Sequence, residues 1–164
     1  EITTRLVGSE MCIRDSISIE KDTDLSFGGN RITWFQYPSK DTNHHSLITR
    51  VAFGDRAIIM LADVGRAVHD WLAKEHASEI GAEIVKLPHH GIYAPKKVMI
   101  QAINPELCIV TNGDNKDSAK TVKNVKSWKL HLLFTTRGDI EMVTDGQMWY
   151  ARQYDIVKAA NVKK

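Results

Sequence analysis

Three short polar segments of the sequence contain residue types that bind metal ions. They contribute five candidate ligands: His44, His45, Asp63, His89 and His90. Imidazole nitrogens and carboxylate oxygens together suit zinc, manganese or iron. Asp63 ends a long apolar run, where a carboxylate is costly unless it is paired or bound to a metal. Gly91 follows the two histidines and lets the backbone turn close to a ligand. The sequence therefore predicts a metal site built from these segments.

Each segment also has a structural interpretation. Asp63 could cap the helix that starts at Gly65, because an aspartate side chain accepts hydrogen bonds from free N–H groups at a helix start. His44 and His45 could form an exposed turn. Only the combination of the three segments favours a metal site over these alternatives.

Three other histidines are predicted to have no part in the site. His69 and His76 fall on the polar side of the helix predicted over 65–76, so we expect both to be solvated. His131 opens a predicted strand and has no partner nearby in the sequence, which favours a structural role.

The elements that position these residues alternate between strands and helices. Apolar and β-branched runs predict strands over 31–37, 46–53, 57–62, 83–87, 107–111, 131–135, 139–143 and 147–152. Helices are predicted over 65–76, from Pro95 and from the N-cap residue Ser118. Their expected buried residues are Val68, Trp71, Leu72, Met99, Ile103, Val122 and Val125. Hairpins followed by strand–helix–strand units indicate an α/β fold with a mixed sheet. In such folds, ligands gather at the C-terminal ends of strands.

Composition places few limits on function. The 164 residues suit one domain, and a net charge of +2 does not by itself indicate a nucleic-acid-binding protein. No apolar run reaches the roughly 18 residues that a membrane span needs. Neither cysteine lies in a Cys/His cluster, and Cys108 is expected in the core.

A lysine stripe follows the predicted strand over 107–111. Its members are Lys116, Lys120, Lys123, Lys126 and Lys129. Such a stripe could steer a polyanion such as nucleic acid. The alternative is an ordinary solvated helix face.

The N-terminal residues do not look like a native protein segment. Residues 7–16 resemble a translated sequencing adapter of the kind that contaminates metagenomic assemblies. If so, residues 1–16 are artefactual and do not belong to the fold. The alternative is a native strand and loop.

The order of the motifs resembles the metallo-β-lactamase superfamily, and most closely the hydrolase domain of competence-type DNA-uptake channel proteins and their soluble relatives. The likeness runs from about residue 42 to 143. It includes Asn43 with Ser46-Leu47-Ile48, the Gly54-Asp55 turn, Asp63, and Leu87-Pro88-His89-His90-Gly91. Further parts of the likeness are the segments 104–107, 111–115 and 135–140.

The resemblance implies a fold and a site. Residues 17–154 would form the C-terminal half of an αββα sandwich, followed by a basic tail over 155–164. His44 or His45 would be a ligand, Asp63 would bridge two divalent metals (zinc, or else manganese or iron), and His90 or His89 would be the last ligand. Asp63 and His89 would be catalytic. Residues that would contact substrate are Asn112, Lys120 and Lys123.

The sequence also departs from the family pattern. The family's Thr-Gly-Asp is Leu61-Ala62-Asp63 here, the usual serine after His-His-Gly is Ile92, and the His-X-His-X-Asp-His motif does not occur. We therefore expect a fragment of a metal-dependent hydrolase that cleaves phosphodiester or other ester bonds, nucleic acid among the possible substrates. The alternative is a catalytically degenerate binding or scaffold domain. Either a cytoplasmic or an extracytoplasmic location fits the sequence.

Overall fold

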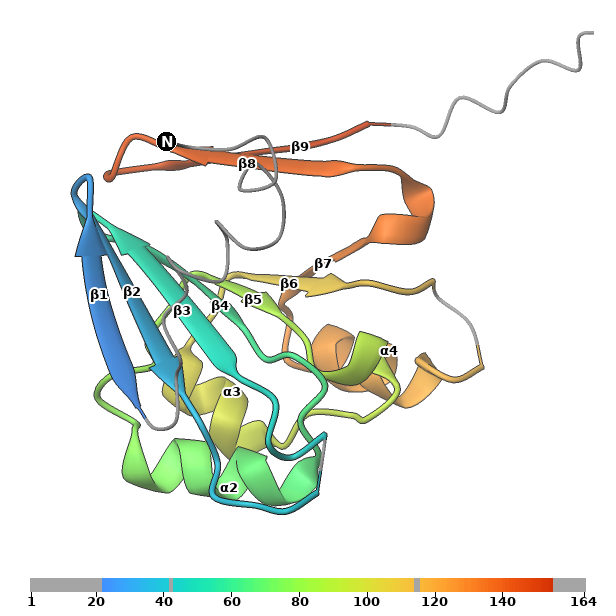
Figure 1. Ribbon diagram of the computed structural model, residues 1–164. Helices are drawn as coiled ribbons and strands as arrows, with labels where there is room; N and C mark the ends of the chain where they lie inside the picture. Colours follow the sequence, from blue (N-terminus) through green and yellow to red (C-terminus); the bar gives the residue numbers. More distant parts are fainter. Residues whose placement is uncertain (1–21, 42, 114–115, 155–164) are drawn as a thin grey trace, which may run out of the picture.

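The computed structural model describes residues 22–41, 43–113 and 116–154. The predicted artefactual segment over 1–16 and the predicted basic tail over 155–164 lie outside the described residues. The described chain is an α/β structure whose centre is a mixed β-sheet (Figure 1). The fold class predicted from the sequence is confirmed at this level.

The main sheet has seven strands that lie side by side in chain order. They are β1 (Thr23–Phe27), β2 (Asn30–Phe35), β3 (Ile48–Phe53), β4 (Arg56–Met60), β5 (Ile84–Lys86), β6 (Leu107–Val110) and β7 (His131–Phe134). The first four pair antiparallel, with tight turns between β1 and β2 and between β3 and β4 and a longer segment, 36–47, between β2 and β3, whereas β4 to β7 pair parallel. Parallel neighbours need a crossover connection, and helices provide it here.

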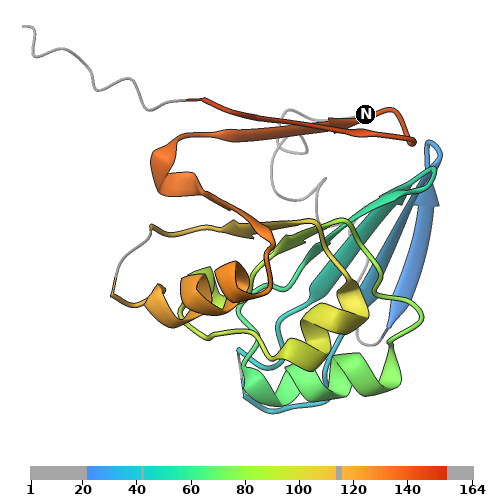
Figure 2. The ribbon, with the colours of Figure 1, turned by 180° about the vertical axis from the view of Figure 1, so that it is seen from behind.

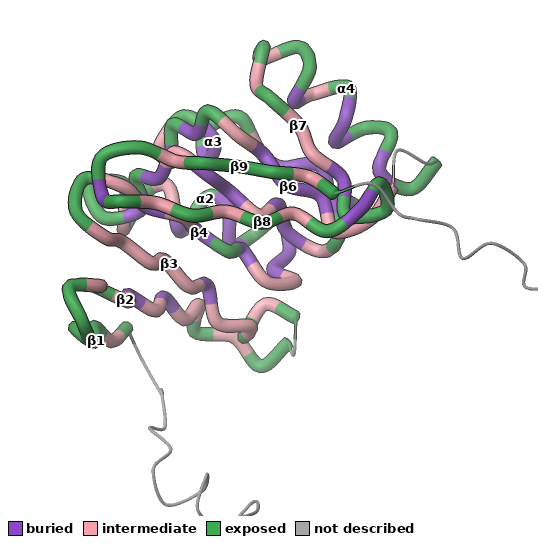
Figure 3. The backbone as a smooth tube through the Cα atoms, turned by 90° about the horizontal axis from the view of Figure 1, so that it is seen from above, coloured by how far each residue is buried: buried purple, intermediate pink, exposed green. Residues whose placement is uncertain are grey.

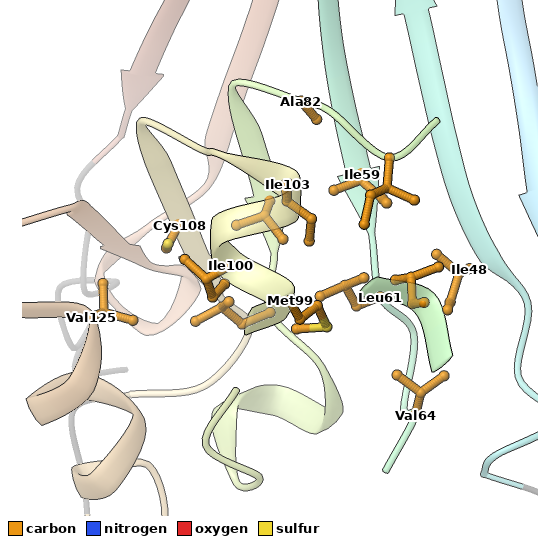
Figure 4. Close-up of a cluster of buried hydrophobic side chains, with 14 of the residues drawn as sticks. Ile48, Ile59, Leu61, Val64, Ala82, Met99, Ile100, Ile103, Cys108 and Val125 are labelled. Atoms are coloured by element: carbon orange, nitrogen blue, oxygen red, sulfur yellow. The ribbon is translucent and has the colours of Figure 1, made fainter. Parts of the chain in front are cut away.

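Three helices cover one face of this sheet (Figures 1 and 2). They are α2 (Arg66–Glu75), α3 (Lys97–Ile103) and α4 (Ala119–Ser127). The core lies between them and the sheet, where strand residues such as Ile59 meet helix residues such as Met99 and Ile103 (Figure 4). These three side chains are fully or almost fully buried. Apolar residues at every second strand position therefore face the helices.

A separate hairpin lies on the other face of the sheet. It consists of β8 (Ile140–Thr144) and β9 (Trp149–Gln153), and it crosses above β4 to β6 while β1 and β2 lie to one side (Figures 1 and 3). Its turn meets the β3–β4 turn, where the Asp55 N–H donates to the Gly146 carbonyl at 2.8 Å. Helices therefore cover one face of the sheet, and the hairpin covers part of the other face.

The predicted elements agree closely with the structure. The eight predicted strands are present with bounds that differ by at most two residues, and the expected buried residues are buried except for Trp71, which is half-buried. Cys108 is buried, as expected. Strand β1 was not predicted, because its sequence is largely polar and exposed. Ser118 precedes α4, but its hydroxyl donates to the Gly113 carbonyl and makes no side-chain cap.

Candidate metal site

The loops that leave β4, β5 and β6 meet at one edge of the sheet. Asp63 follows β4, His89 and His90 follow β5, and Thr111 follows β6. Because these strands are parallel and adjacent, their C-terminal ends lie at the same edge. The fold therefore brings two of the three predicted segments directly together.

Asp63 and His90 face each other across this edge. Their Oδ2 and Nε2 atoms are 3.8 Å apart, and both side chains are about half exposed. The other ring nitrogen of His90, Nδ1, lies 3.0 Å from the Thr111 hydroxyl. If Nδ1 carries the proton and donates to Thr111, the lone pair of Nε2 faces the carboxylate. A carboxylate oxygen and an imidazole nitrogen in this arrangement can share one cation.

His89 contacts the backbone of Asp63, in contrast to His90, which faces the carboxylate. Its Nδ1 lies 3.3 Å from the backbone carbonyl of Asp63, and its ring packs on Tyr93 with 4.6 Å between ring centroids. Both contacts fix the ring beside the loop and leave Nδ1 engaged. Of the two histidines, His90 thus has the better geometry for a ligand.

His44 reaches the site loop from the other side. Its Nε2 lies against Gly65, so close that a Cβ atom at that position would be 2.2 Å away. Backbone hydrogen bonding of His44 to the Asp41 carboxylate, at 3.0 Å, holds the turn that carries it. Because Gly65 has no side chain, the His44 ring can lie against its backbone. Gly65 itself is two residues after Asp63 in the chain.

His45 faces a different part of the surface. It lines a broad, open groove of about 1140 Å³ together with Trp71, Glu75 and His76. That groove lies between α2 and the segment that follows β2, and Asp63 is not among its lining residues. The structure therefore separates the two members of this histidine pair.

Lys86 is a site residue that the sequence reasoning missed. It ends β5, and its Nζ donates to the Ala62 carbonyl at 3.2 Å and lies 3.9 Å from Asp63 Oδ1. Burial lowers the pKa of Lys86, and the Asp63 charge opposes that shift. The available signal in the sequence was a lysine at the end of a predicted buried strand, with an aspartate at the end of the buried strand before it.

The predicted substrate contacts lie on neighbouring segments. Asn112 follows Thr111, is half-buried, and accepts the Gly113 N–H at 2.8 Å. Lys120 and Lys123 are exposed on α4. The alternative interpretation of the lysine stripe, a solvated helix face, is compatible with that exposure.

One buried histidine and one largely covered histidine correct the sequence analysis. His69 is completely buried on α2, and neither ring nitrogen has a hydrogen-bond partner among the described residues. His76 packs edge-on against Phe35 and Trp71, with only 12% of its side chain exposed. The prediction that both are solvated is wrong, because α2 turns His69 towards the protein, and the rings of Phe35 and Trp71 cover His76 at the C-terminal end of the helix.

The donor set fits a metal only in part. Asp63 and His90 are placed to share a cation, but within the described parts of the chain no three His, Cys, Asp or Glu side chains form a group that could hold one. Asp63 is also not the helix cap, because that position belongs to Gly65. The described residues thus provide two facing donors, with His44 and His89 close to the same loop.

Comparisons with known proteins add no assignment: no family model, curated protein or solved structure matches the chain. Over residues 22–41, 43–113 and 116–154, no helix is long and apolar enough to cross a membrane.

Proposed function

We propose that this chain carries part of the centre of a metal-dependent hydrolase, which acts on phosphodiester or other ester bonds through a metal-activated water. In this proposal the mixed sheet and its helices are the C-terminal half of a metallo-β-lactamase-type αββα sandwich. The observation that carries the proposal is the 3.8 Å approach of Asp63 Oδ2 and His90 Nε2 at the C-terminal ends of β4 and β5. Ligands of α/β proteins bind at such strand ends.

Asp63 and His90 would hold the cation, with zinc as the first expectation and manganese or iron as alternatives. A divalent cation in such a site lowers the pKa of a bound water and stabilises negative charge on a phosphoryl or acyl oxygen. The chain's own residues orient these donors: Thr111 fixes the His90 ring, and His89 braces the Asp63 backbone. Two divalent metals in such a site would need further ligands, for which His44, whose ring lies against Gly65, is a candidate.

A second candidate function is a binding or scaffold domain that keeps this fold without catalysis. The specific observation in its favour is the ammonium group of Lys86, which lies 3.9 Å from Asp63 and already supplies a positive charge there. Ile92, 40% exposed where the family has serine, also favours it. Under this alternative Asp63 needs no metal.

Calorimetric titration of the protein with zinc and manganese tests the proposal. We expect Asp63→Ala and His90→Ala to weaken binding at least tenfold, since each removes one of two donors. His45→Ala is the matched control, because it removes a histidine of the same chain that faces a different groove. Equal affinities in all four proteins would contradict the assigned ligands.

Hydrolysis then separates the two candidate functions. Bis(4-nitrophenyl) phosphate and 4-nitrophenyl acetate are suitable probes for a phosphodiesterase and an esterase. The hydrolase proposal expects a metal-dependent rate that is abolished in Asp63→Ala. Metal binding without any turnover of either probe would favour the scaffold function.

A further inference from the structure

Lys86 occupies a position where a lysine is costly. The strand register places it between Met60 of β4 and Ile109 of β6, on the face of the sheet away from the helices. Only 20% of its side chain is exposed. An ammonium group removed from water to this extent needs polar partners. Its partners in the structure are the Ala62 carbonyl and the Asp63 carboxylate.

The Ala62 carbonyl links the turn after β4 to Lys86 at the end of β5 and to His89 in the loop that follows. Ala62 has a φ of 45°, a left-handed conformation that an L-residue with a side chain adopts only at a cost. Its carbonyl oxygen accepts hydrogen bonds from Lys86 Nζ at 3.2 Å and from the His89 N–H at 2.9 Å. The turn of Ala62 therefore directs Asp63 away from the line of β4, and both bonds stabilise that turn.

The Asp63 carboxylate lies between two groups that can carry positive charge. Lys86 Nζ lies 3.9 Å from Oδ1, and His90 Nε2 lies 3.8 Å from Oδ2. Lys86 thus contacts the backbone that aims the carboxylate and also the carboxylate itself. Neither contact depends on a metal ion.

We propose that Lys86 is a positioning residue: it holds Asp63 opposite His90 and acts as its counter-charge until a cation binds. Two consequences follow. Without Lys86 the Ala62 turn opens more often. A divalent cation beside Asp63 also experiences less repulsion, because a neighbouring ammonium group disfavours a second cation. The second consequence rests on the proposed function, whereas the first does not.

Amide hydrogen exchange tests the positioning role in the metal-free protein. Lys86→Met keeps the length of the side chain and removes its charge and donors, and Lys86→Arg keeps both. We expect the His89 amide to exchange roughly tenfold faster in Lys86→Met and at the wild-type rate in Lys86→Arg. The Leu87 amide, which donates to the Ile109 carbonyl at 2.9 Å, is the internal control for general destabilisation. Equal acceleration of both amides, or of neither, would overturn the positioning role.

Zinc titration tests the counter-charge. Lys86→Met should bind zinc about tenfold more tightly than Lys86→Arg, because the loss of the repulsive charge at 3.9 Å from Asp63 outweighs the looser Ala62 turn. A ratio of one or less would overturn this assignment. If neither wild type nor either variant binds zinc, the proposed metal-dependent function fails for this chain, while the exchange result still decides whether Lys86 positions Asp63.

Discussion

Replacing His69 with phenylalanine should remove a pH-dependent loss of stability from this protein. His69 is completely buried, and both its ring nitrogens lack partners within the described chain. Burial is the main cause that lowers its pKa from 6.5 to about 4; the nearby charges of Arg66 and Lys96 contribute in the same direction, and Asp70 opposes them. Phenylalanine has a similar shape and no ionisable group.

The magnitude follows from linkage between protonation and folding. Below pH 6.5 the unfolded chain takes up a proton on this imidazole, whereas the folded protein keeps it neutral down to about pH 4. The free energy of unfolding therefore falls as the pH falls through this window, by about 3 kcal/mol in total, at about 1.4 kcal/mol per pH unit over most of it. In His69→Phe this contribution disappears. At neutral pH the variant should also gain about 1–3 kcal/mol, because two unsatisfied buried nitrogens are removed.

Urea unfolding at several pH values between neutral and about pH 4 measures the difference. The quantity of interest is how the stability gap between wild type and His69→Phe widens as the pH falls, since the carboxylates shared by both proteins cancel. His131→Phe is the control, because His131 is exposed at the start of β7 and its replacement leaves the core intact. A gap that stays constant over this range would refute the argument that burial keeps His69 neutral.

Three further predictions address other parts of the chain. Gly65→Ala should displace the His44 ring, because a Cβ atom would lie 2.2 Å from His44 Nε2. It should change the free energy of unfolding by less than about 1 kcal/mol, since Gly65 has an ordinary φ of −87°. The NMR signals of the His44 ring check this, and unshifted signals would count against the contact. Glutamine at both Lys120 and Lys123 should flatten the salt dependence of single-stranded DNA binding, measured by fluorescence anisotropy, if the stripe contacts phosphates; an unchanged slope would leave these lysines as a solvated face. Cys108 should resist iodoacetamide near neutral pH, because burial raises the pKa of its thiol to about 12; mass spectrometry should find it alkylated only after unfolding in urea.

The sequence predicted the elements well where periodicity and burial coincide. The apolar run before Asp63 became β4, and the residues spaced for one helix face, Val68 and Leu72, are buried on α2. Strand β1 escaped prediction because its residues are mostly exposed, so no apolar pattern marks it. Hydrophobic periodicity detects an element through the apolar residues on its buried side, and an exposed edge strand has few such residues.

The candidate site was predicted in its residue types but not in its geometry. Sequence order cannot separate His44 from His45 or His89 from His90, because adjacent residues differ only in where the backbone aims them. In the structure His90 faces Asp63 while His89 contacts the Asp63 carbonyl, and this depends on left-handed backbone at both histidines. The burial of His69 was missed for a related reason: a hydrophobicity pattern counts histidine as polar wherever it lies.

Left-handed backbone is concentrated where the candidate ligands lie. Of the five non-glycine residues with positive φ in the described chain, three, Ala62, His89 and His90, belong to this one edge of the sheet. Each costs roughly 1–2 kcal/mol relative to an ordinary conformation. Glycine at position 62 would relieve that cost, so a selection for thermostability alone should drift towards it. The present alanine marks a place where the chain keeps a less stable arrangement, and a library selected for stability without any functional requirement would show whether it is retained.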